Sequence, residues 1–344
     1  MDWFERLTGF REAGYEETRR QLKVEGQTLQ SLVNGRRYGI GELELASLQS
    51  LRERVAAGDG LPGRLAVRNV SGDVRRMHRQ PENAGALFQV ASQFNLLEMV
   101  SPGVTPEQGV TRYEHDRTQG PACAIAAGAG TIYRNYFAPV GEGFGQTGAR
   151  QLDGLADLGA ALSQAIGCPT TALWSMVNGY ALCSRDGLAT IGKHLASLDA
   201  AATEGLRGLL RIGLHRDVEV TDGDGPARQL VSQAYCSALP VAYTRVPSAL
   251  WQRFAQLVLE AAYEATLCAA VLNAQRGAPN VVLLTRLGGG AFGNDDGWID
   301  AALQRALTGA AGFGLDVRLV SYGMPPASMV ALQKAFGPAA ARTD

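Results

Sequence analysis

The stretch from Leu283 to Leu303, LLTRLGGGAFGNDDGWIDAAL, places glycines, one aromatic ring and several carboxylates within a few residues of each other. Glycines let backbone N–H groups approach a phosphate closely, and a helix that begins after them adds a positive dipole. Phe292 can cover the apolar face of a sugar. These residue types predict a loop that binds a diphosphate. The alternative is a tight strand-to-helix turn, in which Asn294 or Asp295 caps the helix and Asp296 complements its dipole.

The same glycines also satisfy the GxGxxG pattern of dinucleotide-binding folds, through Gly288, Gly290 and Gly293. That fingerprint requires an acidic residue at the end of the next strand, about 20 residues further on. Here Asp316 precedes the next predicted strand instead, and no second βαβ half follows. An NAD-dependent oxidoreductase is therefore the least favoured of the functions considered.

A second acidic group occurs in the segment EHDRTQG, from Glu114 to Gly120. If Glu114 and Asp116 meet Asp295 in space, the carboxylates could hydrolyse a glycosidic bond. Such a reaction needs one carboxylate to activate water or stabilise positive charge, and a second group to protonate the leaving atom. The same acids could instead bind a cationic substrate without catalysing a reaction. No HxxxH or HxH spacing suggests a metal site, and no metal is expected, although the acids could hold a hydrated magnesium.

The elements that must position these residues alternate between strand and helix from Leu65 onward. The periodicity predicts strands at 65–70, 86–92, 172–177, 209–214, 232–238, 281–287 and 317–321, and helices at 121–135, 151–165, 187–206, 248–275 and 298–307. This alternation predicts an α/β fold with a mixed, largely parallel central sheet. Ligands bind such sheets beyond the carboxyl ends of the strands, where both acidic segments are expected.

The first 60 residues are predicted to form a mainly helical extension. It would contain an initial helix, a short strand at 27–33 and a helix at 42–56. The glycine-rich stretch at 56–63 is typical of a linker. We therefore expect an extension at 1–60 and one larger catalytic domain at 64–330.

Composition narrows the class of protein. The 344 residues carry a formal net charge of -1, which argues against a nucleic-acid partner. The five cysteines form no CxxC pair and are expected to be reduced. The N-terminus lacks an apolar signal segment, and the most apolar helix contains Glu260 and Glu264, which indicates a buried helix. We expect a cytoplasmic protein without a membrane partner.

The sequence GGGAFGND resembles the second ligand loop of macrodomains, particularly the GVFGND-type loop of microbial poly(ADP-ribose) glycohydrolases. The resemblance implies a macrodomain-like three-layer α/β/α sandwich. It also implies that the loop wraps the diphosphate of ADP-ribose and that Phe292 packs by the distal ribose. The loop residues with this implied role are Gly288, Gly289, Gly290, Ala291, Phe292, Gly293 and Asn294.

Other segments carry the same resemblance. NVSGDV is similar to a macrodomain turn, which implies that Asp73 accepts a hydrogen bond from adenine. ALFQVASQFNLLE resembles the strand that ends in an asparagine, which implies that Asn95 points towards the distal ribose. The alternatives are an Asx-turn at Asp73 and a turn closed by Asn95. The first loop lacks the GGG…QEE pattern of the glycohydrolases and is more similar to that of the divergent MavL-like ADP-ribosyl hydrolases.

The resemblance implies a hydrolase that removes ADP-ribose from protein arginine, with ADP-ribosylated ubiquitin as one candidate substrate. Glu114, Asp116 and Asp295 are the implied catalytic residues, and Gln119 and Asp300 are expected to contact the ligand. No cofactor is expected, and the implied partners are ADP-ribose and an ADP-ribosylated protein. The second hypothesis is a non-catalytic reader that binds ADP-ribose through the same loop.

Overall fold

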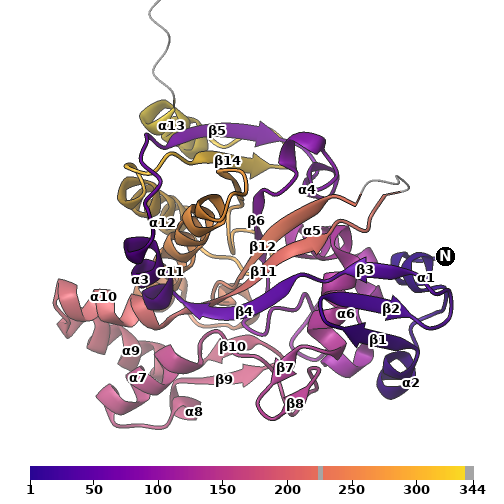
Figure 1. Ribbon diagram of the computed structural model, residues 1–344. Coiled ribbons are helices and arrows are strands. Elements are labelled where there is room, and N and C mark those ends of the chain that lie inside the picture. The colour runs from indigo at the N-terminus through magenta and orange to yellow at the C-terminus, as the bar shows by residue number, and fades with distance from the viewer. Residues whose placement is uncertain (224–227, 338–344) are drawn as a thin grey trace, which may run out of the picture.

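A seven-stranded sheet lies at the centre of the computed structural model, which describes residues 1–223 and 228–337 (Figure 1). The strand order is β4-β11-β12-β6-β13-β14-β5. Its strands are β4 (Glu42–Ser47), β5 (Ala66–Ser71), β6 (Leu87–Ala91), β11 (Arg211–Glu219), β12 (Leu230–Cys236), β13 (Val281–Leu284) and β14 (Asp316–Ser321). Only β11 runs antiparallel to its neighbours within this sheet. The predicted mixed, largely parallel sheet is confirmed.

Helices cover both faces of this sheet. The long helix α11 (Ser248–Gln275) packs on one face, together with α3 (Leu48–Ala57), α9 (Arg185–Ser197) and α12 (Asp296–Gly309). The other face is covered by α4 (Val74–Met77), α5 (Gln119–Ala126) and α6 (Gly128–Tyr136). In β13, alternate residues point into the two apolar layers, so the whole strand is buried. The predicted α/β/α sandwich is therefore confirmed.

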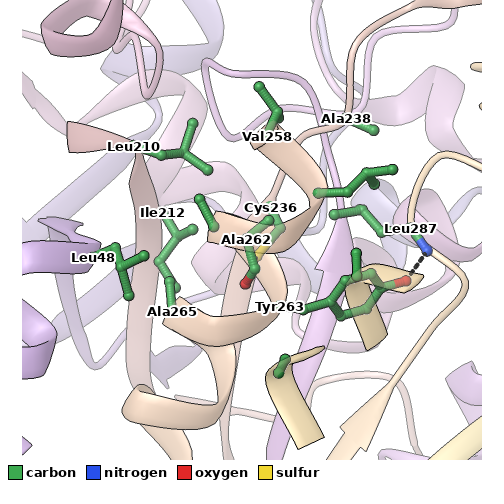
Figure 2. Packing of buried hydrophobic residues seen from close by; sticks show 14 of the residues in the cluster. Leu48, Leu210, Ile212, Cys236, Ala238, Val258, Ala262, Tyr263, Ala265 and Leu287 are labelled. Carbon is green, nitrogen blue, oxygen red and sulfur yellow. Dashed lines mark hydrogen bonds between the residues drawn. The ribbon is translucent and has the colours of Figure 1, made fainter. Parts of the chain in front are cut away.

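Helix α11 has the length and hydropathy of a membrane span, but 78% of its most apolar window is buried inside the protein. Its acids are paired with arginines of the surrounding helices. Glu260 forms an ion pair with Arg207, and Glu264 forms one with Arg305 at 2.6 Å. The helix is the centre of the core (Figure 2), as its acidic residues predicted.

The end of the N-terminal segment belongs to the sandwich, and the segment contains more strand than predicted. After α1 (Trp3–Thr8) and α2 (Tyr15–Arg20) comes a small antiparallel sheet of β1 (Leu22–Glu25), β2 (Thr28–Ser31) and β3 (Arg37–Gly39). The helix predicted at 42–56 begins as β4, because the ELELAS alternation suits an edge strand beside β11. Ser47 then caps α3 by accepting a hydrogen bond from Ser50 N–H at 3.2 Å. The predicted boundary near residue 60 thus lies after two elements of the sandwich.

Three other predicted elements differ. The predicted strand at 172–177 becomes α8 (Thr170–Leu173) and β9 (Trp174–Val177), which pairs only with β10 (Tyr180–Cys183). The predicted helix at 121–135 is divided at Ala127, where Thr221 N–H donates to the Ala126 carbonyl and Thr221 Oγ accepts from Gly128 N–H. The predicted helix at 187–206 is divided where Asp199 caps α10.

The remaining elements are shorter or peripheral. They are β7 (Pro139–Val140), β8 (Gly143–Phe144), α7 (Ala156–Ile166), α10 (Ala200–Leu209), α13 (Ala327–Phe336) and the 3-10 turns η1 (Pro81–Asn83), η2 (Pro106–Gln108), η3 (Thr111–His115) and η4 (Val241–Tyr243). All five cysteines are free, as expected for reduced residues.

Candidate functional site

An open cleft lies beyond the carboxyl ends of β6 and β13, where ligands bind α/β sheets. It has about 690 Å³ of free space, including the part open to solvent. Besides Tyr180, Ala238 and Tyr243, three chain segments line it. They are the loop after β6 (residues 91–93 and 98–100), the start of α5 with the residues before it (116 and 118–121), and the loop after β13 (285–288 and 290–292). The two acidic segments singled out in the sequence therefore approach the same space.

The glycine loop after β13 folds tightly on itself. Gly288 and Gly293 have φ of 74° and 67°, a left-handed conformation that favours glycine. The Gly288 carbonyl accepts a hydrogen bond from Asn294 N–H at 3.0 Å, and the Gly290 carbonyl accepts one from Gly293 N–H at 3.1 Å. Within the described chain, the N–H groups of Gly290, Ala291 and Phe292 find no acceptor. These three residues line the cleft, and their N–H groups are not used by the described protein.

Tyr263 of α11 holds the base of this loop (Figure 2). Its hydroxyl donates to the Thr285 carbonyl at 2.8 Å and accepts from Leu287 N–H at 2.8 Å. Burial raises the pKa of Tyr263 above its ordinary value, so the hydroxyl stays protonated and can serve as donor and acceptor together. The loop is therefore fastened to the core helix rather than only to its own strand.

On the opposite side, the first turn of α5 faces the cleft. Gln119 links this helix to β6, because its side chain accepts from Ala91 N–H at 2.9 Å and donates to the Gln89 carbonyl at 2.8 Å. Gln119 and Gly120 are the first two residues of the helix, and their N–H groups have no acceptor in the described residues. A helix N-terminus of this kind attracts anions.

Two carboxyl groups lie beside this helix start. Asp116 is half-buried, and its Oδ1 accepts from Thr118 N–H at 2.8 Å. Glu98, in the loop after β6, is only 3% exposed. Burial raises the pKa of Glu98 well above its usual value, Arg134 offsets part of this rise, and Asp116 adds to it. Sequence reasoning considered the segment around Glu98 for its asparagine and missed its carboxylate.

Aromatic rings form another wall of the cleft. Tyr180, Tyr243 and Phe292 pack together with ring centroids 5.1 to 5.6 Å apart. They come from three separate segments, and all three line the cleft. Such a wall can stack on a sugar or base, or contact a cation through ring faces.

The structure brings some of the predicted site residues together. Asp116, Gln119, Gly288, Gly290, Ala291 and Phe292 all line the cleft. Gly289 and Gly293 lie within the loop but do not line the cleft. Asn294 is buried below the loop, where its side-chain amide donates to the Leu239 carbonyl at 2.9 Å.

Asn95 lies away from the cleft, which corrects its predicted contact with a ligand. A turn after β6, closed by the hydrogen bond from Gln93 N–H to the Leu97 carbonyl, directs Asn95 inwards. Its amide donates to Gln151 at 2.8 Å and its oxygen accepts from Leu97 N–H at 3.1 Å. Asn95 therefore closes a turn, which was the alternative considered.

The remaining predicted acids also occupy other places. Asp73 and Asp295 are the N-caps of α4 and α12, and their side chains accept from Arg75 N–H and Gly297 N–H. Glu114 is exposed and accepts from Trp3 N–H at 3.4 Å. Asp300 forms an ion pair with Arg286. None of these four residues lines the cleft.

Arg286 lines the cleft and was not anticipated from the sequence. It lies two residues beyond β13, and its guanidinium is held by Asp300 and by Asp296 at 2.7 Å. The two carboxylates orient it below the glycine loop. The described residues contain no group of three or more His, Cys, Asp or Glu side chains that could hold a metal ion.

Comparison with known proteins finds no matching family model and no matching curated protein. Solved structures do match. A poly(ADP-ribose) glycohydrolase from Thermomonospora curvata has 14% identity and a TM-score of 0.44, over 93% of this chain and 95% of that chain. A poly(ADP-ribose) glycohydrolase from Deinococcus radiodurans, in complex with ADP-ribose, has 15% identity and a TM-score of 0.43, over 85% and 93%. At this identity and TM-score the likeness assigns neither ligand nor reaction.

Proposed function

We propose that this protein binds ADP-ribose in the cleft and hydrolyses the bond between ADP-ribose and a protein arginine. The observation that carries the proposal is the arrangement of unused backbone donors on two sides of one cleft. The N–H groups of residues 290–292 lie on one side, and the helix start at 119–120 lies on the other. Donors of this kind bind phosphate oxygens without requiring a basic side chain.

The other walls of the cleft suit the remaining parts of the conjugate. The aromatic wall of Tyr180, Tyr243 and Phe292 offers ring faces to the distal ribose and to a guanidinium. Asp116 supplies a carboxylate near the helix start, where it can activate water or stabilise positive charge on the sugar. A carboxylate beside aromatic rings also favours a cationic leaving group, and this supports arginine as the modified residue.

The direct test is incubation with arginine-ADP-ribosylated ubiquitin, with free ADP-ribose as the product to be measured. We expect release by the wild-type protein and loss of release with Asp116→Asn, while calorimetry still detects ADP-ribose binding to that variant. Binding of ADP-ribose without any release by the wild type would contradict hydrolysis and favour the reader hypothesis. Tighter binding of NADH than of ADP-ribose would contradict the proposal as a whole.

A further inference from the structure

Glu98 is a buried carboxylic acid on the wall of the cleft, and the proposed function gives it no role so far. Its Oε1 is buried and finds no hydrogen-bond partner within the described residues. Its Oε2 packs against the first turn of α5, since a Cβ at Gly120 would lie 2.2 Å from it and 2.0 Å from the Ala91 carbonyl. Only glycine therefore fits at position 120. The helix start is built closely around this carboxyl group.

The backbone on both sides of Glu98 is fixed by hydrogen bonds from distant segments. Glu98 N–H donates to the hydroxyl of Tyr113 at 2.9 Å. Met99 N–H donates to Gln93 Oε1 at 2.7 Å, and the Met99 carbonyl accepts from the Tyr180 hydroxyl at 2.5 Å. The side chain, in contrast, is left with an unpaired oxygen, which costs folding free energy. A buried carboxyl group without a hydrogen-bond partner, held by a fixed backbone at the wall of a cleft, is typical of a functional site.

We infer that Glu98 is a further catalytic residue, which donates a proton to the leaving nitrogen while Asp116 accepts one from the attacking water. This inference rests on the proposed function. The bond from the anomeric carbon of the distal ribose to the guanidine nitrogen breaks, and the electron pair stays with the nitrogen. The substrate group is a guanidinium, so this cleavage first gives a neutral guanidine; its nitrogen takes the proton of Glu98, and the arginine leaves as a guanidinium. The water oxygen bonds to the anomeric carbon, its proton passes to Asp116, and solvent restores both carboxyl groups.

The protonation state of Glu98 agrees with this role. Burial raises its pKa well above the usual value, which favours the protonated form that a general acid needs. The titratable groups that interact with Glu98 come from several elements and are Tyr113, Asp116, Cys123, Arg134, Tyr180 and Tyr235. Arg134 is the cation among them, and it opposes the rise without cancelling it.

The test is Glu98→Gln, which keeps the shape of the side chain but removes the acidic proton. We expect release of ADP-ribose from modified arginine to fall by about 100-fold or more. A para-nitrophenyl ADP-ribose has a leaving group that needs no proton, and its cleavage should stay within about tenfold of the wild-type rate. ADP-ribose affinity by calorimetry should change by less than about threefold. The matched control is Glu53→Gln on α3, which is exposed and remote from the cleft.

The outcomes separate the inference from the proposed function. If the wild type cleaves neither substrate, the proposed function fails. If the wild type is active and Glu98→Gln loses both activities equally, or neither, only the role of Glu98 fails. If Glu98 had only a structural role, Glu98→Gln would also lower the melting temperature of the protein. If Glu98 is catalytic, the melting temperature should not fall, because the replaced carboxyl oxygen is unpaired. Should the variant not fold, the wild-type pH profile still decides: the arginine substrate should lose rate as pH rises through the Glu98 pKa, and the para-nitrophenyl substrate should not.

Discussion

Gly288 and Gly290 lie two residues apart in the loop, but their surroundings differ. A Cβ at Gly288 would lie 2.5 Å from Ala238 Cβ, and the residue has a φ of 74°. A Cβ at Gly290 would meet no heavy atom within 4 Å. Gly288 is thus required by the path of the backbone, while Gly290 leaves space that a ligand can enter.

We expect Gly288→Ala to lower the free energy of unfolding by about 1–3 kcal/mol, because the left-handed conformation and the contact with Ala238 both oppose a side chain. Gly290→Ala should change it by less than about 0.5 kcal/mol. Denaturant unfolding of both variants measures the difference. Equal stability of the two would show that the loop relaxes more readily than its geometry indicates.

At the residue scale, the sequence predicted the location of the glycine loop better than that of the acids. Asp116, Gly288 and Gly290 line the cleft, because they lie in the segments just after β13 and just before α5. Asn95 was expected to face the ligand, but the turn after β6 has Leu96 at φ 64° and directs the asparagine inwards. Glu98, for which no role was predicted, lines the cleft instead. A single non-glycine residue in a left-handed conformation has no recognisable sequence pattern, so this turn could not be predicted from the sequence.

At the scale of elements, α11 supports the cleft as well as the core. Its Tyr263 connects the buried helix to both ends of the turn at Thr285 and Leu287. We expect Tyr263→Phe to lower the free energy of unfolding by about 1–3 kcal/mol, because two buried partners lose a hydrogen bond. It should also weaken ADP-ribose binding in calorimetry, since the loop loses its anchor.

The matched control for that variant is Tyr133→Phe on α6. Tyr133 is half-buried, and within the described residues its hydroxyl makes no hydrogen bond. Its loss should leave both stability and affinity close to wild type. If Tyr263→Phe behaves like this control, the helix does not hold the loop.

Elements buried on both faces were predicted well, and so was the edge strand β5, but the edge strand β4 was not. The long apolar segment of α11 and the short apolar run of β13 each fit few types of secondary structure other than a buried helix and a buried strand. Segment 42–56 has a pattern that fits either a strand or a helix, and pairing with β11 decides for the strand over its first six residues. The breaks near Ala127 and Asp199 likewise depend on capping contacts that local periodicity does not contain.

At the scale of the whole molecule, stability should depend on pH through buried histidines. Burial lowers the pKa of His78 to about 4. Its ring contacts the Val74 carbonyl at 2.8 Å through Nδ1 and the side-chain nitrogen of Gln233 at 3.1 Å through Nε2. The neutral ring can donate at the first contact and accept at the second. A cationic ring would place two donors against each other at Gln233.

Because the folded state holds His78 neutral, its contribution to stability is complete above the unfolded pKa of about 6.5 and decreases as pH falls towards 4. We expect His78 alone to lower the free energy of unfolding by about 2 kcal/mol as the pH falls from 6.5 to 5. Unfolding titrations at several pH values should show a shallower slope for His78→Gln than for the wild type. His194→Gln on α9 serves as control and should keep the wild-type slope.

The sheet order joins segments that are far apart in the chain. Ser47 of β4 pairs with Arg211 of β11, and Ala66 of β5 pairs with Asp316 of β14. Both outer strands are therefore translated long before their partner strands. Until the partners emerge from the ribosome, the backbone N–H and C=O groups of the outer strands stay unpaired. The nascent polypeptide cannot complete its cleft until the loop after β13 has been translated, so termination before that loop would yield a fragment prone to aggregate.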